Sequence, residues 1–260
     1  MRKGILGIVA LSTLLLSPAV QASGQEMTLD TFQGRLCDDA SLQRGAGVFM
    51  NYCAGCHSLQ YMRYKGLGEG IGIRDARTGE ALEDLIQQQL NFVTDKVHDA
   101  VVSAIPAKDA ESWFGVAPPD LTLVARVRGT DWLYTYLKSF YKDTSRPWGV
   151  NNLVFPDVGM PHVLVALQGV QEPVMKTVST EASDGAHTHE VIDHLELVEP
   201  GLLTPEEYDV LVTDLVNFLE FTGEPIKLER QRLGVWVMLF LVIFMLFTWL
   251  LKREYWKDVH

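Results

Sequence analysis

Cys53-Ala54-Gly55-Cys56-His57 is the stretch from which the rest of the chain can be interpreted. Two cysteines separated by two residues and followed at once by a histidine form the attachment signature of c-type haem. In that signature the thiols of Cys53 and Cys56 bond to the haem vinyl groups, and His57 supplies an axial nitrogen to the iron. A structural zinc site would need four ligands, and a thioredoxin-like pair would need a strand followed by a helix. The motif therefore predicts one covalently bound haem c.

Both ends of the 260-residue chain are apolar. The first 22 residues combine a basic start, an apolar stretch and small residues at 19–22, which is the pattern of a secretory signal peptide. Leu233 to Leu251 is an uncharged run whose length, as a helix, spans about 28 Å, close to the hydrocarbon thickness of a membrane. We therefore divide the chain into a signal peptide (1–22), an exported haem domain (23–225), a transmembrane anchor helix (226–252) and a cytoplasmic tail (253–260).

The formal net charge of −11 describes an acidic protein. Such a charge argues against nucleic acid as a partner and favours basic protein partners. An excess of acidic residues is also a common means of keeping a protein soluble, so the charge alone assigns no function.

The spacing of apolar residues predicts several helices. Residues 41–52, with Ser41 as N-cap, form the first and place the haem motif at its C-terminal end. Others are predicted over 81–92, from Thr130 onward, and from a capping box at Thr204 to Gly223. The glycines of 65–75 predict a flexible loop. We expect Cys37 to be a buried thiol, with pairing between chains as the alternative.

A haem used for electron transfer needs a second axial ligand, and a thioether is a typical one. Met50 and Met62 lie too near the attachment motif to reach the opposite face, and Met27 lies in an irregular stretch. Met160 stands between glycine and proline in a stiff loop, and we take it as the ligand with Met175 in reserve.

The arginine pair at 126 and 128 and the polar segment 181–199 can each be interpreted in two ways. Arg126 and Arg128 lie in an apolar stretch, and either could meet a haem propionate or form an ordinary surface pair. Residues 181–199 contain His187, His189 and His194 among carboxylates. A solvated hairpin or loop insertion is favoured there over a divalent metal site, because nothing fixes a ligand geometry.

These features together resemble the cytochrome c1 family in its bacterial form. The resemblance rests on ASLQRGAGVFMNYCAGCHSLQYMRY around the motif, APPDLTLVARVRG, the GMP loop and the single C-terminal anchor. It implies a mainly α fold, a class I cytochrome c-like haem domain with loop insertions plus one C-terminal transmembrane helix. It also implies that Cys53 and Cys56 hold the haem, that His57 and Met160 ligate iron, and that Arg128 meets a propionate.

The function implied by the resemblance is electron transfer within quinol:cytochrome c oxidoreductase. The chain would carry single electrons from the Rieske iron-sulfur protein to cytochrome c, beside cytochrome b, in a dimeric complex. It would sit in the inner membrane with one span and its haem domain on the periplasmic side, with no catalytic residues of its own. The alternatives are a free-standing anchored cytochrome c that feeds a terminal oxidase, and a haem gas sensor or enzyme with an open iron position.

Overall fold

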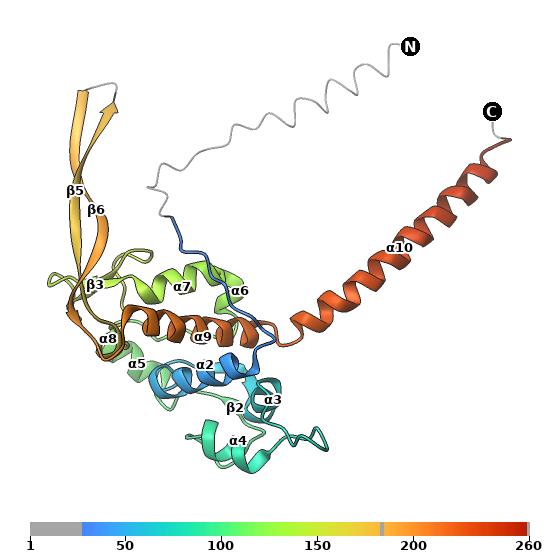
Figure 1. Cartoon of the computed structure of the whole chain (residues 1–260), viewed down its shortest axis with the longest axis horizontal. Coiled ribbons are helices and arrows are strands. Elements are labelled where there is room, and N and C mark those ends of the chain that lie inside the picture. Colours follow the sequence, from blue (N-terminus) through green and yellow to red (C-terminus); the bar gives the residue numbers. More distant parts are fainter. Residues whose placement is uncertain (1–27, 183–184, 259–260) are drawn as a thin grey trace.

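The structure is a computed structural model that describes residues 28–182 and 185–258, so the predicted signal peptide lies outside the described residues. Helices make up most of its regular structure, which confirms the mainly α prediction (Figure 1). The elements in chain order are α2 (Asp39–Tyr52), β1 (Leu59–Arg63), α3 (Tyr64–Gly70), α4 (Glu83–Leu90), β2 (Ala100–Val101), α5 (Ala107–Phe114), α6 (Val124–Arg128), α7 (Thr130–Lys138), β3 (Phe140–Lys142), β4 (Val150–Asn152), α8 (Val165–Gln168), β5 (Gly169–Ala182), β6 (Gly185–Pro200), α9 (Pro205–Gly223) and α10 (Lys227–Tyr255).

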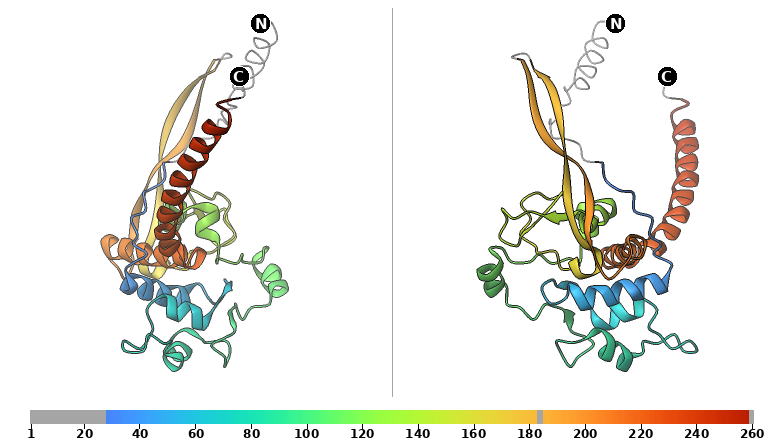
Figure 2. Two further views of the ribbon diagram at one scale, coloured as in Figure 1. Left: turned by 90° about the vertical axis from the view of Figure 1, so that its right-hand side faces the viewer. Right: turned by 60° about the vertical axis from the view of Figure 1, so that its left-hand side comes forward.

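The centre of the domain is the contact between α2 and α9, which lie side by side in both figures of the whole chain (Figures 1 and 2). Gly45 permits the close approach, because a Cβ there would overlap the backbone carbonyl of Asp214 and lie 2.7 Å from the Cβ of Phe218. Beside it, the Arg44 guanidinium donates two hydrogen bonds to Asp214, of 2.6 and 2.9 Å. This pairing fixes the helix that ends at the haem motif.

Helix α9 also holds α7, the helix that follows the two arginines. The Tyr208 hydroxyl donates to the Leu137 carbonyl at 2.8 Å, and Tyr134 and Lys138 both donate to the Asp209 carboxylate. The capping box predicted at the start of α9 is present, with Thr204 accepting from the Glu207 backbone and Glu207 accepting from that of Thr204. Helix α9 thus orients both α2 and α7.

Three sequence predictions are wrong. The first helix begins at Asp39 with Asp38 as its N-cap, because the Asp38 carboxylate accepts from the Ser41 backbone and Ser41 itself is buried. Residues Tyr64–Gly70 form helix α3 and not a flexible loop. Gly68 and Gly70 are needed for packing, since a Cβ would overlap Ile86 and Phe221 respectively. Finally, the Cys37 thiol is exposed, because it lies in the turn that precedes the N-cap.

The polar segment after the methionine loop forms a hairpin, as favoured from the sequence. Strands β5 and β6 pair antiparallel from Gly169↔Pro200 to Ala182↔Gly185, and the ribbon projects from the domain (Figures 1 and 2). It begins about a dozen residues earlier than the polar stretch suggested. Within the described residues no group of three or more potential metal ligands occurs.

Helix α10 leaves the domain at Lys227 (Figure 2). Its first turn forms ion pairs from Lys227 to Glu220 and from Arg230 to Glu224, and none of its residues is buried within the described part of the chain. Its most apolar window has a mean hydropathy of 2.5 and no buried residue. Among the described residues it alone is long and apolar enough to cross a membrane. It continues to Tyr255, three residues beyond the predicted end of the anchor.

We predict that Gly45→Ala lowers the free energy of unfolding by about 1–3 kcal/mol, because the added methyl forces α2 away from α9. The measurement is unfolding of the detergent-solubilised chain followed by circular dichroism.

Gly47→Ala is the matched control in the same helix. A Cβ at Gly47 meets nothing within 4 Å, so this substitution should raise stability by about 0.5–1 kcal/mol through helix propensity. Equal loss of stability in both variants would contradict the proposed role of the close approach.

Candidate haem site

The attachment motif is a tight turn at the end of α2. Cys53 is the C-cap of the helix, and its carbonyl accepts from the backbone N–H groups of Cys56 and His57 at 3.0 and 2.8 Å. Ser103 fastens the turn from outside, because its hydroxyl donates to the Gly55 carbonyl at 2.7 Å. The Cys53 thiol is buried, and burial raises its pKa to about 12, so it is held as the neutral thiol in this structure. The structure thus brings both cysteines and the histidine together in one rigid loop.

His57 is oriented by the segment that begins Ala117-Pro118-Pro119. Its Nδ1 lies 2.7 Å from the Pro119 carbonyl oxygen, and because a carbonyl can only accept, Nδ1 carries the proton. Nε2 is therefore the nitrogen with a free lone pair, as iron ligation requires. Burial lowers the pKa of the His57 imidazole, although the Pro119 carbonyl acts in the opposite direction. The ring is held neutral, in one tautomer and in one orientation.

The same segment is bonded to the residues after the motif. The Leu121 N–H donates to the Ser58 carbonyl at 2.9 Å, and the Gln60 N–H donates to the Asp120 carboxylate at 2.8 Å. These bonds run beside the Pro119 contact, so the carbonyl that orients His57 is itself fixed.

Met160 lies in the loop between β4 and α8, and buried amides define its path. The side-chain oxygen of Asn152 accepts from the N–H groups of Val154 and Phe155 at 3.0 and 3.2 Å. The Asn151 side-chain oxygen accepts from the Asp157 N–H at 2.9 Å. Through these bonds the start of the loop is attached to the domain, and Met160 follows a short distance on.

Helix α7 contacts the Met160 thioether through Tyr136. The Tyr136 hydroxyl lies 3.4 Å from its sulfur atom and donates to it. Burial raises the pKa of the Tyr136 phenol, which therefore stays protonated. By contrast, Met50 and Met62 are each 8% exposed within the core, and Met175 lies on the projecting ribbon at 48% exposure. Of these four methionines, Met160 is the one in a half-buried loop.

The two arginines diverge, which sequence spacing could not show. The Arg128 guanidinium lies over the ring of Trp132, 5.0 Å from its centroid, and 5.7 Å from that of Phe155. The Arg126 side chain instead extends toward Gly223 at the end of α9, its Cγ 3.3 Å from where a Cβ would lie. Neither arginine pairs with a carboxylate among the described residues.

The residues present fit a haem with two axial ligands. The available groups are two thiols, which could attach the haem, and an imidazole with a free Nε2 and a thioether, which could bind its iron. Apolar side chains near the methionine loop are partly exposed, with Val116 at 58% and Phe155 at 41%. Val116 lies beside Gly159, 3.4 Å from where its Cβ would be. An apolar macrocycle would cover such surface favourably.

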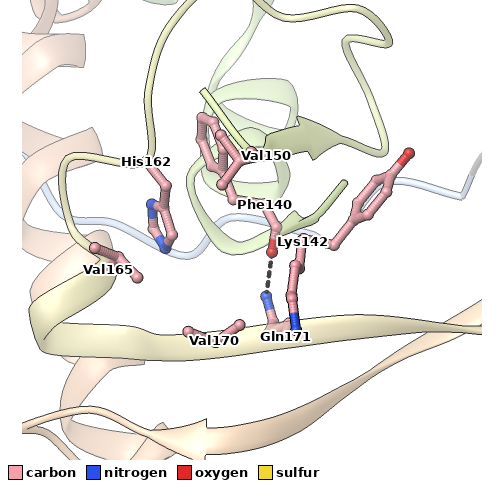
Figure 3. Close-up of a pocket in the computed structure, with 9 residues that line it drawn as sticks. Phe140, Lys142, Val150, His162, Val165, Val170 and Gln171 are labelled. Atoms are coloured by element: carbon pink, nitrogen blue, oxygen red, sulfur yellow. Dashed lines mark hydrogen bonds between the residues drawn. The ribbon is translucent and has the colours of Figure 1, made fainter. Parts of the chain in front are cut away.

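A separate pocket, lined by Phe140, His162 and Val170 among others, does not fit a haem (Figure 3). Its volume is 170 Å³, less than the roughly 300–1,000 Å³ of typical small-molecule sites. His162 faces it, stacked on Phe140 with centroids 4.8 Å apart, and burial lowers the pKa of His162 to about 4. We therefore place no haem ligand there.

Sequence reasoning missed several residues that build the site. Tyr136 falls within the helix predicted from Thr130 onward but had no role in the predicted site, and Asn151, Asn152 and the carbonyl of Pro119 had no role in it either. Two adjacent amides between a strand and the GMP loop were the available signal, because buried amides commonly fix irregular backbone.

Comparison with known proteins shows the family of this chain. A family model described as the cytochrome C1 family matches residues 30–259. The chain belongs to the cytochrome c1 family. Members of this family carry haem, and the match spans the attachment turn, the methionine loop and α10.

Individual relatives extend over the same length. A cytochrome c1 of Allochromatium vinosum is 52% identical over the whole of both chains. The ammonia monooxygenase gamma subunit of Nitrosomonas europaea is 44% identical over 96% of this chain and 97% of its own. A cytochrome b/c1 of Bradyrhizobium diazoefficiens is 28% identical over 86% of this chain, which corresponds to 34% of that longer protein.

We predict that Asn152→Ala destabilises the domain by about 2–4 kcal/mol, because it leaves the backbone N–H groups of Val154 and Phe155 without their acceptor. Unfolding of the solubilised chain measures the effect.

Asn51→Ala is the control, since the Asn51 amide is exposed and bonds only the Gly47 carbonyl of its own helix. Its effect should stay within about 0.5 kcal/mol. A loss for Asn152→Ala no larger than this would contradict the role given to the buried amide.

Proposed function

We propose that this chain is a membrane-anchored c-type cytochrome that carries single electrons from the Rieske iron-sulfur protein to cytochrome c, as a subunit of quinol:cytochrome c oxidoreductase. The observation that carries the proposal is the presence of a tautomer-fixed His57 in the attachment turn and a loop-held Met160 thioether in one chain of the cytochrome c1 family.

The bound haem supplies reversible one-electron transfer, and the chain's residues determine how. Cys53 and Cys56 hold it through two thioether bonds, one haem to the chain. His57 and Met160 would be its two iron ligands, and an iron bound by both would be closed to small ligands, which disfavours a gas sensor or haem enzyme. A thioether with an imidazole also favours the reduced state more than two imidazoles would.

Arg128 is assigned to a haem propionate. Its guanidinium already lies among the site aromatics Trp132 and Phe155 and has no carboxylate partner within the described residues. A propionate would supply that partner, with two parallel hydrogen bonds. Arg126, directed toward α9, is left out of the site.

The arrangement of the chain in the cell follows the same proposal. Residues 1–22 direct export, residues 23–225 form the periplasmic haem domain, 226–252 anchor it in the inner membrane and 253–260 remain in the cytoplasm. The contact of α2 with α9 beside the attachment turn, with α7 and the methionine loop opposite, supports a class I cytochrome c-like core. The β5–β6 ribbon and the segments around α4 and α5 are then the loop insertions.

Partners are inferred from the relatives and the charge. The Bradyrhizobium protein is named for both cytochrome b and cytochrome c1, which supports cytochrome b as a neighbour of this chain. The Rieske protein is the electron donor, and the complex is a dimer. The net charge of −11 favours a basic cytochrome c as acceptor, with docking weakened by salt.

The ammonia monooxygenase name of one relative gives a second candidate, a subunit of that enzyme. The full-length 52% identity to a protein named cytochrome c1, together with the family match, favours the first.

The test is purification of the tagged full chain from solubilised membranes. Cytochrome b and an iron-sulfur protein should copurify with it, and the preparation should reduce cytochrome c with quinol as donor. Copurification with a terminal oxidase, or with monooxygenase subunits, would contradict the proposal.

We predict that Arg128→Gln lowers the haem reduction potential, because loss of a nearby cation stabilises the ferric state. A threefold to tenfold shift of the redox equilibrium corresponds to roughly 30–60 mV for one electron. Arg126→Gln, two residues away and turned to α9, is the control and should leave the potential unchanged. The reverse result would reassign the propionate to Arg126.

A further inference from the structure

We propose that Tyr136 is a positioning residue for the haem iron. Its hydroxyl holds the Met160 thioether and, by donating a hydrogen bond to the ligand sulfur, raises the reduction potential. This inference rests on the proposed ligation of iron by Met160.

The ring of Tyr136 is fixed on two sides. Trp132, one helical turn earlier in α7, stacks on it with centroids 5.0 Å apart and planes 11° apart. Phe140 meets it edge-on at 5.1 Å and 70°. Pairs of this geometry are the favoured ones between aromatic rings. The ring therefore cannot turn its hydroxyl away from the methionine loop without breaking both contacts.

The backbone that carries Tyr136 is tied to the same loop. The Asn152 amide donates to the Tyr136 carbonyl at 2.8 Å, while the oxygen of that amide accepts from Val154 and Phe155 on the way to Met160. One buried amide thus sets the spacing between the hydroxyl and the loop that presents the sulfur. The 3.4 Å contact between Oη and Sδ has support from both sides.

The Tyr136 hydroxyl has one defined hydrogen-bond partner. Among the described residues, the Met160 sulfur is the single hydrogen-bond partner of the Tyr136 hydroxyl. A buried hydroxyl usually finds a strong acceptor, whereas a thioether is a weak one. A phenylalanine would serve the two aromatic contacts equally well, so packing alone does not explain the hydroxyl.

The expected effect on the reduction potential follows from the lone pairs of the Met160 sulfur. A thioether has two lone pairs, of which one can bind iron while the other accepts the hydrogen bond. Donation from the hydroxyl withdraws electron density from sulfur and makes it a poorer donor to ferric iron. Removal of the hydroxyl should therefore stabilise the ferric state and lower the potential.

The test is Tyr136→Phe in the full-length, haem-loaded, detergent-solubilised protein. Redox titration should show a twofold to fivefold shift of the equilibrium toward the ferric form, about 18–41 mV for one electron. The weak long-wavelength band that a thioether ligand gives to ferric haem should shift or weaken while the haem is retained.

Tyr134→Phe is the matched control. Tyr134 lies in the same helix and donates its hydrogen bond to Asp209, away from Met160. Its removal should cost stability and leave both band and potential unchanged. Equal shifts in the two variants would overturn the inference.

Met160→Leu separates this inference from the proposed function. If the wild-type protein lacks the thioether band, or keeps it in Met160→Leu, the ligand assignment fails. If Met160→Leu loses the band but Tyr136→Phe leaves band and potential unchanged, only the role of Tyr136 is overturned.

Discussion

The hydrogen bond from His57 Nδ1 to the Pro119 carbonyl sets the geometry of the whole site. A histidine that binds a metal almost always donates its other ring N–H to an acceptor, which fixes the tautomer and the orientation of the ring. Here the acceptor lies 62 residues away in sequence, so this orientation of the His57 ring requires the folded domain. The backbone and carboxylate bonds around Ser58 and Asp120 then fix the acceptor in turn.

The methionine loop is held in place by a different set of contacts. The methionine loop has little regular structure, and buried amides at Asn151 and Asn152 replace it as the source of rigidity. Helix α7 brings Trp132 and Tyr136 to the loop, and α9 holds α7 in place through Tyr208. Since α9 also packs on α2 at Gly45, one helix connects the helix that leads into the attachment turn with the helix that contacts the methionine loop.

The sequence predicted the parts of this arrangement that depend on local chemistry. The attachment motif, the capping box at Thr204 and the long apolar α10 each follow from residues close together in the chain. The ligand roles of His57 and Met160 stay predictions, although the structure gives both residues suitable surroundings. What could not be predicted depends on distant contacts. Residues 68 and 70 are glycines within a helix because the side chains of Ile86 and Phe221 occupy the space that a Cβ would take. Arg126 and Arg128 point in different directions because the first contacts the end of α9 and the second lies over Trp132.

The central claim is that iron lies between the imidazole of His57 and the thioether of Met160. X-ray absorption at the iron edge of the haem-loaded, solubilised chain tests it most directly, because it reports the elements bound to iron. The account predicts five nitrogen neighbours and one sulfur neighbour in both oxidation states. Six nitrogen neighbours, or five with an open position, would contradict it.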